Sequence, residues 1–259
     1  MTGGVKRERD GKARAKPPAD APRGRFHDMF ERFRDELDEH HDRRERIIKA
    51  SRDVTAQSKK IIFTLQRVKT VKQEFPPETE KEVASRMAEI ARLLQSVAPD
   101  LQSVNRHRYA WQMRGLEELT EALSLGHYLR HQRLITPAEA QAAVPAAIVL
   151  TAHDYLYGVF DLFGELMRFA TVHRAAVLPA QDDGAGCRPI LRDMQELGCA
   201  FETLPHAPSK DYRSKMDAMR QSVRKVENLG YGLVVRGSER PSGWVPDLKD
   251  DAPEPVEPV

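Results

Sequence analysis

The chain has 259 residues, of which 40% are hydrophobic and 31% are charged, and its formal net charge at pH 7 is +2. This length allows one large domain or two small ones, and any surface for nucleic acid must be local because the net charge is near zero. No apolar run approaches the roughly 20 residues that span a membrane. The N-terminal segment lacks the apolar core of a signal peptide, so we expect no secretion. The two cysteines, Cys187 and Cys199, lack metal-type spacing and suit a reducing compartment.

Both ends of the chain have compositions typical of disorder. Residues 1–24 are basic, rich in Pro and Gly, and almost free of large apolar side chains. Residues 245–259 are acidic and rich in proline. The basic cluster KRERDGKARAK is typical of a nuclear-localisation signal or a weak nucleic-acid patch, and a solubilising tail explains it equally well. We therefore predict one folded region, residues 25–244, between two disordered tails.

Between the tails, apolar residues recur at helical spacing almost everywhere, and strand signals are nearly absent. No proline interrupts the first predicted helix, which runs from Phe26 to about Thr70 and has one candidate break at the double histidine. The remaining predicted helices are, in chain order, one between the prolines of EFPPETEKEVASRMAEIARLLQSVAPD, one from about Val104 to Leu134, a short one with Thr136 as N-cap and Pro137 at its first position, one from Asp154 to about Val172, one over PILRDMQELGCAFETL and one from near Ser209. The sequence therefore predicts an all-α fold of about seven helices with a long first helix.

The segment DYLYGVFDLFGELMRF, which begins at Asp154, predicts a helix that is buried nearly all round, yet it carries Asp161 and Glu165 one turn apart. At about 100° per residue, these three acids and Arg168 share one narrow stripe. One interpretation is that the stripe faces water, with Glu165 and Arg168 as an ion pair. The alternative is that the acids line a cavity and bind a hard cation, because buried carboxylates need partners.

The helix predicted from about Val104 carries three glutamates, and their helical positions separate them. Glu117 lies on a polar face, whereas Glu118 shares its face with Trp111 and several apolar side chains, and Glu121 at the border converges with Glu118. Acid pairs on two facing helices are a known way to bind metal ions inside a bundle. An all-oxygen ligand set favours Mg²⁺, Mn²⁺ or Ca²⁺ over zinc. The candidate metal ligands and catalytic residues are Glu118, Glu121, Asp161 and Glu165.

Other site chemistries have weaker support in the sequence. His127 and His131 have i,i+4 metal spacing, but zinc would need a third ligand and no HExxH motif is present, so we interpret them as helix-surface histidines. No glycine-rich phosphate loop and no G-x-S-x-G motif occurs. A di-iron carboxylate site would require Glu-x-x-His motifs beside the acid pairs, and none is found there.

Four segments of the chain resemble a known family. They are ELDEHHDRRERIIKASRDVTAQSKKIIFTLQRV, LEELTEALSLGHYLRHQRLIT, DYLYGVFDLFGELMR and KVENLGYGLVVRGSE. Over about residues 27–240 the chain is similar to the translin superfamily, and within it to the branch of translin-associated factor X. In that branch four acids fall on Glu118, Glu121, Asp161 and Glu165. Translin itself keeps only the glutamate at the position of Glu165.

The resemblance implies an antiparallel bundle of seven helices that combines with translin into a hetero-octameric shell around single-stranded RNA, with DNA as a further candidate ligand. It also implies an endoribonuclease that depends on Mg²⁺, with Mn²⁺ as an alternative, in which the four acids bind one or two ions. The implied roles are removal of the passenger strand in RNA silencing and tRNA processing, in the cytoplasm and the nucleus, with no membrane association. The alternative is a non-catalytic subunit that binds nucleic acid or acts as a scaffold for translin. Such a subunit need not keep all four acids.

Overall fold

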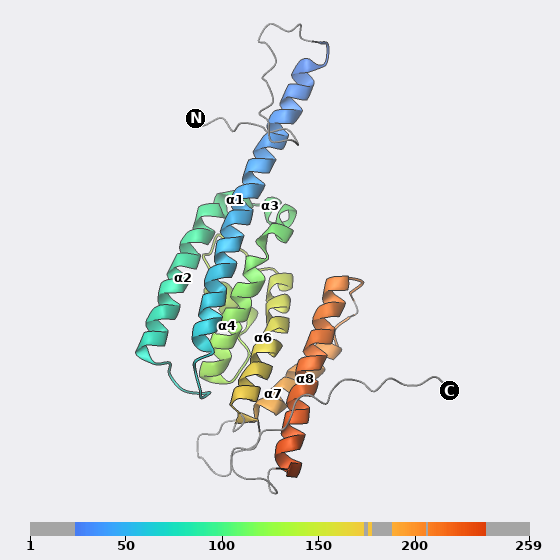
Figure 1. Cartoon of the computed structure of the whole chain (residues 1–259). Coiled ribbons are helices and arrows are strands. Elements are labelled where there is room, and N and C mark those ends of the chain that lie inside the picture. The colour runs from blue at the N-terminus through green and yellow to red at the C-terminus, as the bar shows by residue number, and fades with distance from the viewer. Residues whose placement is uncertain (1–23, 174–175, 178–187, 206, 237–259) are drawn as a thin grey trace, which may run out of the picture. The chain divides into compact units, whose positions relative to one another are not determined.

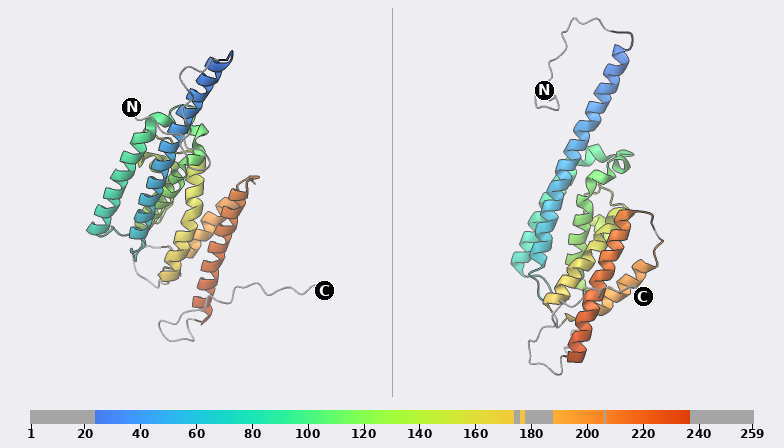
Figure 2. Two further views of the ribbon diagram at one scale, coloured as in Figure 1. Left: turned by 45° about the horizontal axis from the view of Figure 1, so that its top comes forward. Right: turned by 45° about the vertical axis from the view of Figure 1, so that its right-hand side comes forward.

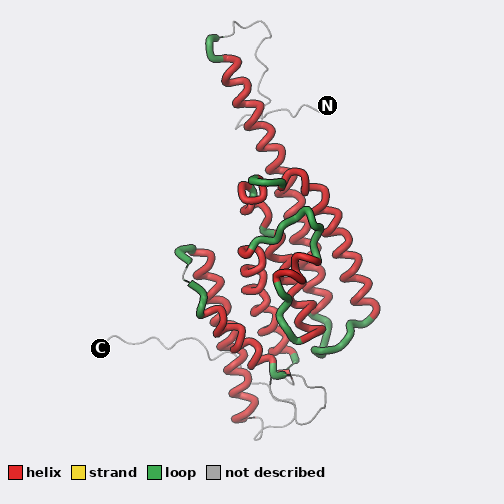
Figure 3. Tube along the Cα trace, turned by 180° about the vertical axis from the view of Figure 1, so that it is seen from behind, coloured by secondary structure: helices red, strands yellow, loops and turns green. Residues whose placement is uncertain are grey.

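The structure, a computed structural model, describes residues 24–173, 176–177, 188–205 and 207–236 (Figure 1). These residues form eight α-helices, two short 3₁₀-helices and no strand (Figure 3). The helices are α1 His27–Leu65, α2 Pro77–Val97, η1 Ala98–Leu101, α3 Asn105–Arg108, η2 Ala110–Met113, α4 Gly115–His131, α5 Pro137–Ala142, α6 Ala152–Val172, α7 Ile190–Glu202 and α8 Lys210–Arg236. None of these helices is long and apolar enough to cross a membrane. The predicted all-α fold is confirmed.

The long first helix is also confirmed. α1 has 39 residues and stays helical through His40 and His41, the candidate break point. The chain divides into two compact units, residues 1–43 and 44–259, and α1 contributes to both. The predicted tails lie outside the described residues except for Gly24, so their disorder stays a prediction.

The single helix predicted from about Val104 to Leu134 is wrong. The chain instead forms α3, η2 and α4, and α4 begins at Gly115, where it meets α1. A Cβ atom at Gly115 would lie 2.5 Å from the carbonyl oxygen of Ser51, and the Gly115 amide donates a hydrogen bond to the Ser51 hydroxyl at 3.0 Å. Apolar periodicity does not report this close approach, because it depends on a residue far away in the sequence.

Helix direction explains how the acids come to face one another. In the unit that begins at Arg44, α1, α4, α6 and α8 run one way, while α2 and α7 run the opposite way (Figures 1 and 2). α4 and α6 lie side by side and parallel, because residues 132–151, which include α5, return the chain before α6 begins. Successive turns of α4 therefore face successive turns of α6.

α4 and α6 approach each other closely at Gly158. A Cβ atom at this position would lie 2.5 Å from the Cβ of Thr120 and 2.6 Å from the backbone oxygen of Glu117, distances that real Cβ atoms do not reach. Gly164, two turns later on α6, has no such neighbour within 4 Å. Only glycine at position 158 lets the two helices reach this separation, and Leu119 of α4 and Leu162 of α6 are fully buried.

We expect Gly158→Ala to lower the free energy of unfolding by about 1–3 kcal/mol, because the added methyl group forces α6 away from α4. The matched control is Gly164→Ala on the same helix, which should raise the free energy of unfolding by about 0.5–1 kcal/mol, because alanine is the better helix former. Urea denaturation of both variants measures the difference. Equal effects of the two substitutions would contradict a close α4–α6 contact at Gly158.

Candidate functional site

Three of the four predicted acids line one groove between α1, α4 and α6. Glu118 and Glu121 come from α4, and Glu165 comes from α6. The groove has a volume of about 280 Å³. Its lining residues are Lys59, Ile62, Phe63, Gln66, Glu118, Glu121, Glu165 and Arg168. The two helices thus present carboxylates to the same space, as their acid pairs predicted.

Asp161, the fourth predicted acid, lies one turn before Glu165 on α6 and binds a lysine of α8. The Lys215 ammonium donates hydrogen bonds to both carboxylate oxygens of Asp161, at 2.6 and 2.5 Å. The same ammonium lies 5.6 Å from the ring centroid of Tyr157. Asp161 is therefore paired with a cation from the last helix, while its charge still acts on Glu121.

Glu121 is the most perturbed carboxyl group of this cluster. Its burial, together with the negative charges of Asp161, Glu118 and Glu165, raises the pKa of Glu121 to about 8, although Lys215 partly opposes the shift. Burial also raises the pKa of Glu118, which Lys59 opposes from 3.9 Å. At neutral pH, Glu121 therefore keeps its proton. The negative charge of the cluster is thus limited by the proton on Glu121 and by the neighbouring cations Lys59 and Lys215.

Glu165 has a neutral partner. Its carboxylate accepts a hydrogen bond of 2.8 Å from the side-chain amide of Gln66, the residue that directly follows α1. The partner expected for a stripe that faces water was Arg168, but Arg168 instead lies exposed at the groove. Glu165 is thus held in the groove by the residue at the end of α1.

The residue types of the groove fit a hard divalent cation, because all its acidic donors are carboxylate oxygens. The present side-chain positions do not complete such a site. Within the described ranges, no three acidic, histidine or cysteine side chains are gathered closely enough to hold a metal ion. Lys215 holds Asp161 and Gln66 holds Glu165, so ion binding would require these carboxylates to leave their partners. The four acids therefore stay a predicted metal site.

The reasoning that separated Glu118 from Glu117 is wrong, although Glu118 does line the groove. The Glu117 side chain is 10% exposed and that of Glu118 is 22% exposed, so Glu117 is the more buried acid. Trp111, placed on the face of Glu118, belongs to η2 and is 69% exposed. The break before Gly115 accounts for Trp111, whereas Glu117 is buried together with Glu121 and Ser124 on one face within α4 itself.

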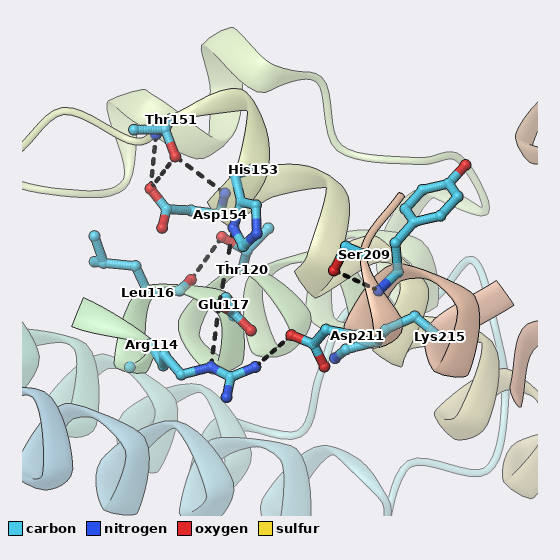
Figure 4. Close-up of polar contacts among 12 residues, drawn as sticks. Arg114, Leu116, Glu117, Thr120, Thr151, His153, Asp154, Ser209, Asp211 and Lys215 are labelled. Carbon is cyan, nitrogen blue, oxygen red and sulfur yellow. Dashed lines mark hydrogen bonds and ion pairs between the residues drawn. The ribbon is translucent and has the colours of Figure 1, made fainter. Parts of the chain in front are cut away.

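Glu117 belongs to a polar network beside the groove (Figure 4). The Arg114 guanidinium lies 3.5 Å from the Glu117 carboxylate and donates a hydrogen bond of 2.8 Å to Asp211 at the start of α8. The ring of His153 lies 3.9 Å from Glu117. Burial raises the pKa of Glu117, while Arg114 opposes the shift. This network joins the first turns of α4, α6 and α8.

Asp154, which shared the predicted stripe with Asp161, does not reach the groove. It is buried and forms a reciprocal capping box with Thr151 at the start of α6 (Figure 4). It also accepts a hydrogen bond from the buried Arg106. The Arg106 guanidinium also binds the backbone oxygen of Val149. Asp154 therefore anchors the first turn of α6 and has a structural role.

The rings of His127 and His131 lie 4.6 Å apart between their centroids on α4. His131 is exposed, as predicted, but His127 is partly buried, so its interpretation as a surface histidine is wrong. Burial lowers the pKa of His127, and its Nε2 atom has no hydrogen-bond partner. This pair lies in a different pocket, against α1 and α2, and not in the acid groove.

Sequence reasoning missed the groove residues that are not acids. Gln66 and Lys215 are far from the acids in the sequence, and nothing in their local pattern marks them. Phe63 does carry a signal, because this large aromatic residue has the basic residues Lys59 and Arg67 four positions to either side in the sequence. An aromatic residue between exposed basic residues is a pattern found in nucleic-acid interfaces.

Comparisons with known proteins agree with this fold. The translin family model matches residues 42–237. The chain is 32% identical over 246 residues to Translin-associated protein X of Mus musculus, covering 85% of this chain and 82% of the relative. It is 27% identical over 213 residues to the Translin-associated protein X homolog of Schizosaccharomyces pombe, covering 82% and 89%. The crystal structure of apo-NeC3PO shares the fold, with a TM-score of 0.57 and 18% identity over 78% of this chain and 95% of that chain.

The raised pKa of Glu121 predicts a pH-dependent stability in the metal-free protein. In the folded state Glu121 keeps its proton up to about pH 8, whereas the ordinary pKa of a glutamate is 4.5. The folded state therefore binds more protons than the unfolded state between these values, and stability falls as pH rises through this window. We expect Glu121→Gln, which stays neutral, to gain stability relative to the natural chain as pH approaches 8.

Denaturation series in EDTA at several pH values measure this difference. Glu139→Gln is the control, because exposed Glu139 has a pKa lowered to about 2 by Arg133 and Thr136 and is ionised in both states above about pH 6. Its effect should be constant up to about pH 9. If Glu121→Gln also changed the free energy of unfolding by the same amount at every pH, the raised pKa of Glu121 would be contradicted.

Proposed function

Because the chain belongs to the translin family, we propose that it is the catalytic subunit of a translin-containing, Mg²⁺-dependent endoribonuclease that cleaves single-stranded or nicked RNA. The observation that carries this proposal is the acid groove, in which Glu118 and Glu121 of α4 lie opposite Glu165 of α6, with Asp161 one turn away. Four acids on two parallel helices, one of them protonated because of its burial and the charges of the other three, are difficult to explain as a purely structural feature.

Assembly with a translin partner is supported by the relatives. Those at 27% and 32% identity are named translin-associated proteins. On this basis we further propose removal of the passenger strand in RNA silencing and tRNA processing as the cellular roles, in the cytoplasm and the nucleus. The matched region covers the whole acid groove, so the proposed catalytic residues lie inside the part of the chain that defines the family.

In the proposed site, Glu118, Glu121, Asp161 and Glu165 would hold Mg²⁺ or Mn²⁺. When bound, the ion would supply a water of lowered pKa and offset negative charge at the scissile phosphate. Glu121 must release its proton to become a ligand, so binding should be favoured by rising pH. Lys215 and Gln66 hold the carboxylates of Asp161 and Glu165 beside the groove until they become ligands.

Exposed cations near the acids are placed to contact the phosphates of a nucleic acid. Lys59 of α1 and Arg168 of α6 line the same groove from opposite helices. Contacts of this kind do not depend on base sequence and weaken with salt. The site thus combines acids for the ion with cations for the substrate backbone.

We expect Asp161→Asn and Glu118→Gln each to lower the cleavage rate of single-stranded RNA by more than about 100-fold, because a neutral amide replaces an ionised ligand. The measurement is an RNase assay on the complex co-purified with translin, with its assembly checked by gel filtration. Glu89→Gln, an exposed acid on α2, is the control and should cleave normally. Normal cleavage by both site variants would exclude a catalytic role and favour the alternative, a subunit that binds nucleic acid or acts as a scaffold.

Removal of the metal should abolish cleavage, and binding should be detectable without any reaction. EDTA should stop RNA cleavage by the complex and added Mg²⁺ should restore it. At about pH 8, Mg²⁺ at 100 times its dissociation constant should stabilise the natural protein by about 2.7 kcal/mol. This stabilisation should be largely absent in a variant that combines Glu118→Gln with Asp161→Asn. Equal stabilisation of that variant would place the ion elsewhere, and cleavage in EDTA would exclude the proposed mechanism.

A further inference from the structure

One residue of the acid groove is a large aromatic side chain that packing does not explain. Phe63 on α1 is 61% exposed, although its neighbours Ile62 and Leu65 are buried in the core. It lines the same groove as Glu118 and Glu165. Full burial of a phenylalanine side chain typically stabilises a fold by about 1.5–3 kcal/mol. Because the ring of Phe63 is mostly exposed, it contributes little of this stabilisation to the fold.

Basic side chains flank this ring. Lys59 lies one turn before Phe63 on α1, and Arg67 lies in the turn that directly follows the end of α1 at Leu65. The Arg67 guanidinium lies 5.4 Å from the Phe63 ring centroid. Lys59 and Arg67 are both mostly exposed, and each has a long-range acidic contact of 3.9 Å, to Glu118 and Glu82 respectively. The segment therefore alternates cation, aromatic ring and cation.

This alternation fits a single-stranded nucleic acid. Every base has a flat π-face that can stack on an exposed aromatic ring, and the phosphates on either side of that base can lie near cations. Arg168 adds a further cation from the other side of the groove. Bases within a duplex are already stacked and paired, so they cannot cover such a ring.

A protein partner is the less suitable occupant of this position. A protein surface that covered Phe63 would also withdraw the neighbouring Glu118 and Glu165 from water, which is costly without new partners. The exposed cations Lys59, Arg67 and Arg168 favour a polyanion instead.

We propose that Phe63 is a stacking platform for one unpaired base beside the acid groove, with Lys59 and Arg168 as contacts for the flanking phosphates. The inference rests on the proposed function and deepens it, because it names how the site selects single-stranded over duplex RNA. Phe63 makes no contact with the reacting atoms in this role. It binds and positions the strand.

The test measures binding of a fluorescently labelled single-stranded oligonucleotide to the translin complex that carries Asp161→Asn, so that cleavage does not interfere. Phe63→Ala should weaken binding by about 5- to 100-fold, the range found when a stacking aromatic is removed. Phe63→Trp should preserve the affinity for the single strand.

The affinity for a duplex of the same length should not change on Phe63→Ala. Trp111→Ala is the matched control, because Trp111 is equally exposed and has Arg114 5.5 Å from its ring but does not line the groove. It should bind normally.

A second arm identifies the stacked base. We use a series of oligonucleotides, each with one abasic site at a different position. One of them should bind the natural and Phe63→Ala complexes with equal affinity, because it lacks the base that stacks on Phe63. Equal losses for single strand and duplex, or no loss at all, would overturn the inference. So would failure of Phe63→Ala to assemble with translin, which would assign the ring to a protein interface.

The two proposals fail in different ways in this design. If Asp161→Asn leaves cleavage intact but binding depends on Phe63, the catalytic assignment is wrong and the stacking platform stands. If the natural complex binds no single-stranded RNA, both are wrong.

Discussion

The close approach of α4 and α6 at Gly158 is the contact on which the acid groove depends. With a Cβ atom only 2.5 Å from its nearest neighbour, any residue but glycine would separate the two helices. The helices are parallel, so the turn that carries Glu118 and Glu121 faces the turns that carry Asp161 and Glu165. The hydrophobic core sets this separation through Leu119, Leu162 and their neighbours, and the acids follow from it.

Four neighbouring carboxylates repel one another, and several separate interactions within the chain offset this repulsion. Glu121 keeps a proton, Asp161 binds Lys215, Glu165 binds Gln66 and Glu118 lies near Lys59. Each partner comes from an element other than the one that bears its acid. The electrostatic balance of the groove therefore depends on residues from α1, α4, α6 and α8 together. In the proposed mechanism, a bound divalent ion would neutralise the carboxylates in place of these partners.

Local patterns predicted most of the fold and the identity of the acids, and long-range contacts account for the failures. The capped helix at Thr136 and the helix that ends at Val172 were predictable because caps and periodicity are local signals. The break before Gly115 was not, because it depends on Ser51, and the same break misplaced Trp111. Lys215 and Gln66 could not be found, since only the folded chain brings them to Asp161 and Glu165.

The pairing of Asp161 with Lys215 has a consequence for the order in which the protein matures. The ribosome completes α4 and α6 before it reaches the last helix, so a growing chain carries all four carboxylates while the residue that neutralises Asp161 does not yet exist. A messenger truncated before that helix would encode a chain in which the half-exposed Asp161 lacks its lysine partner.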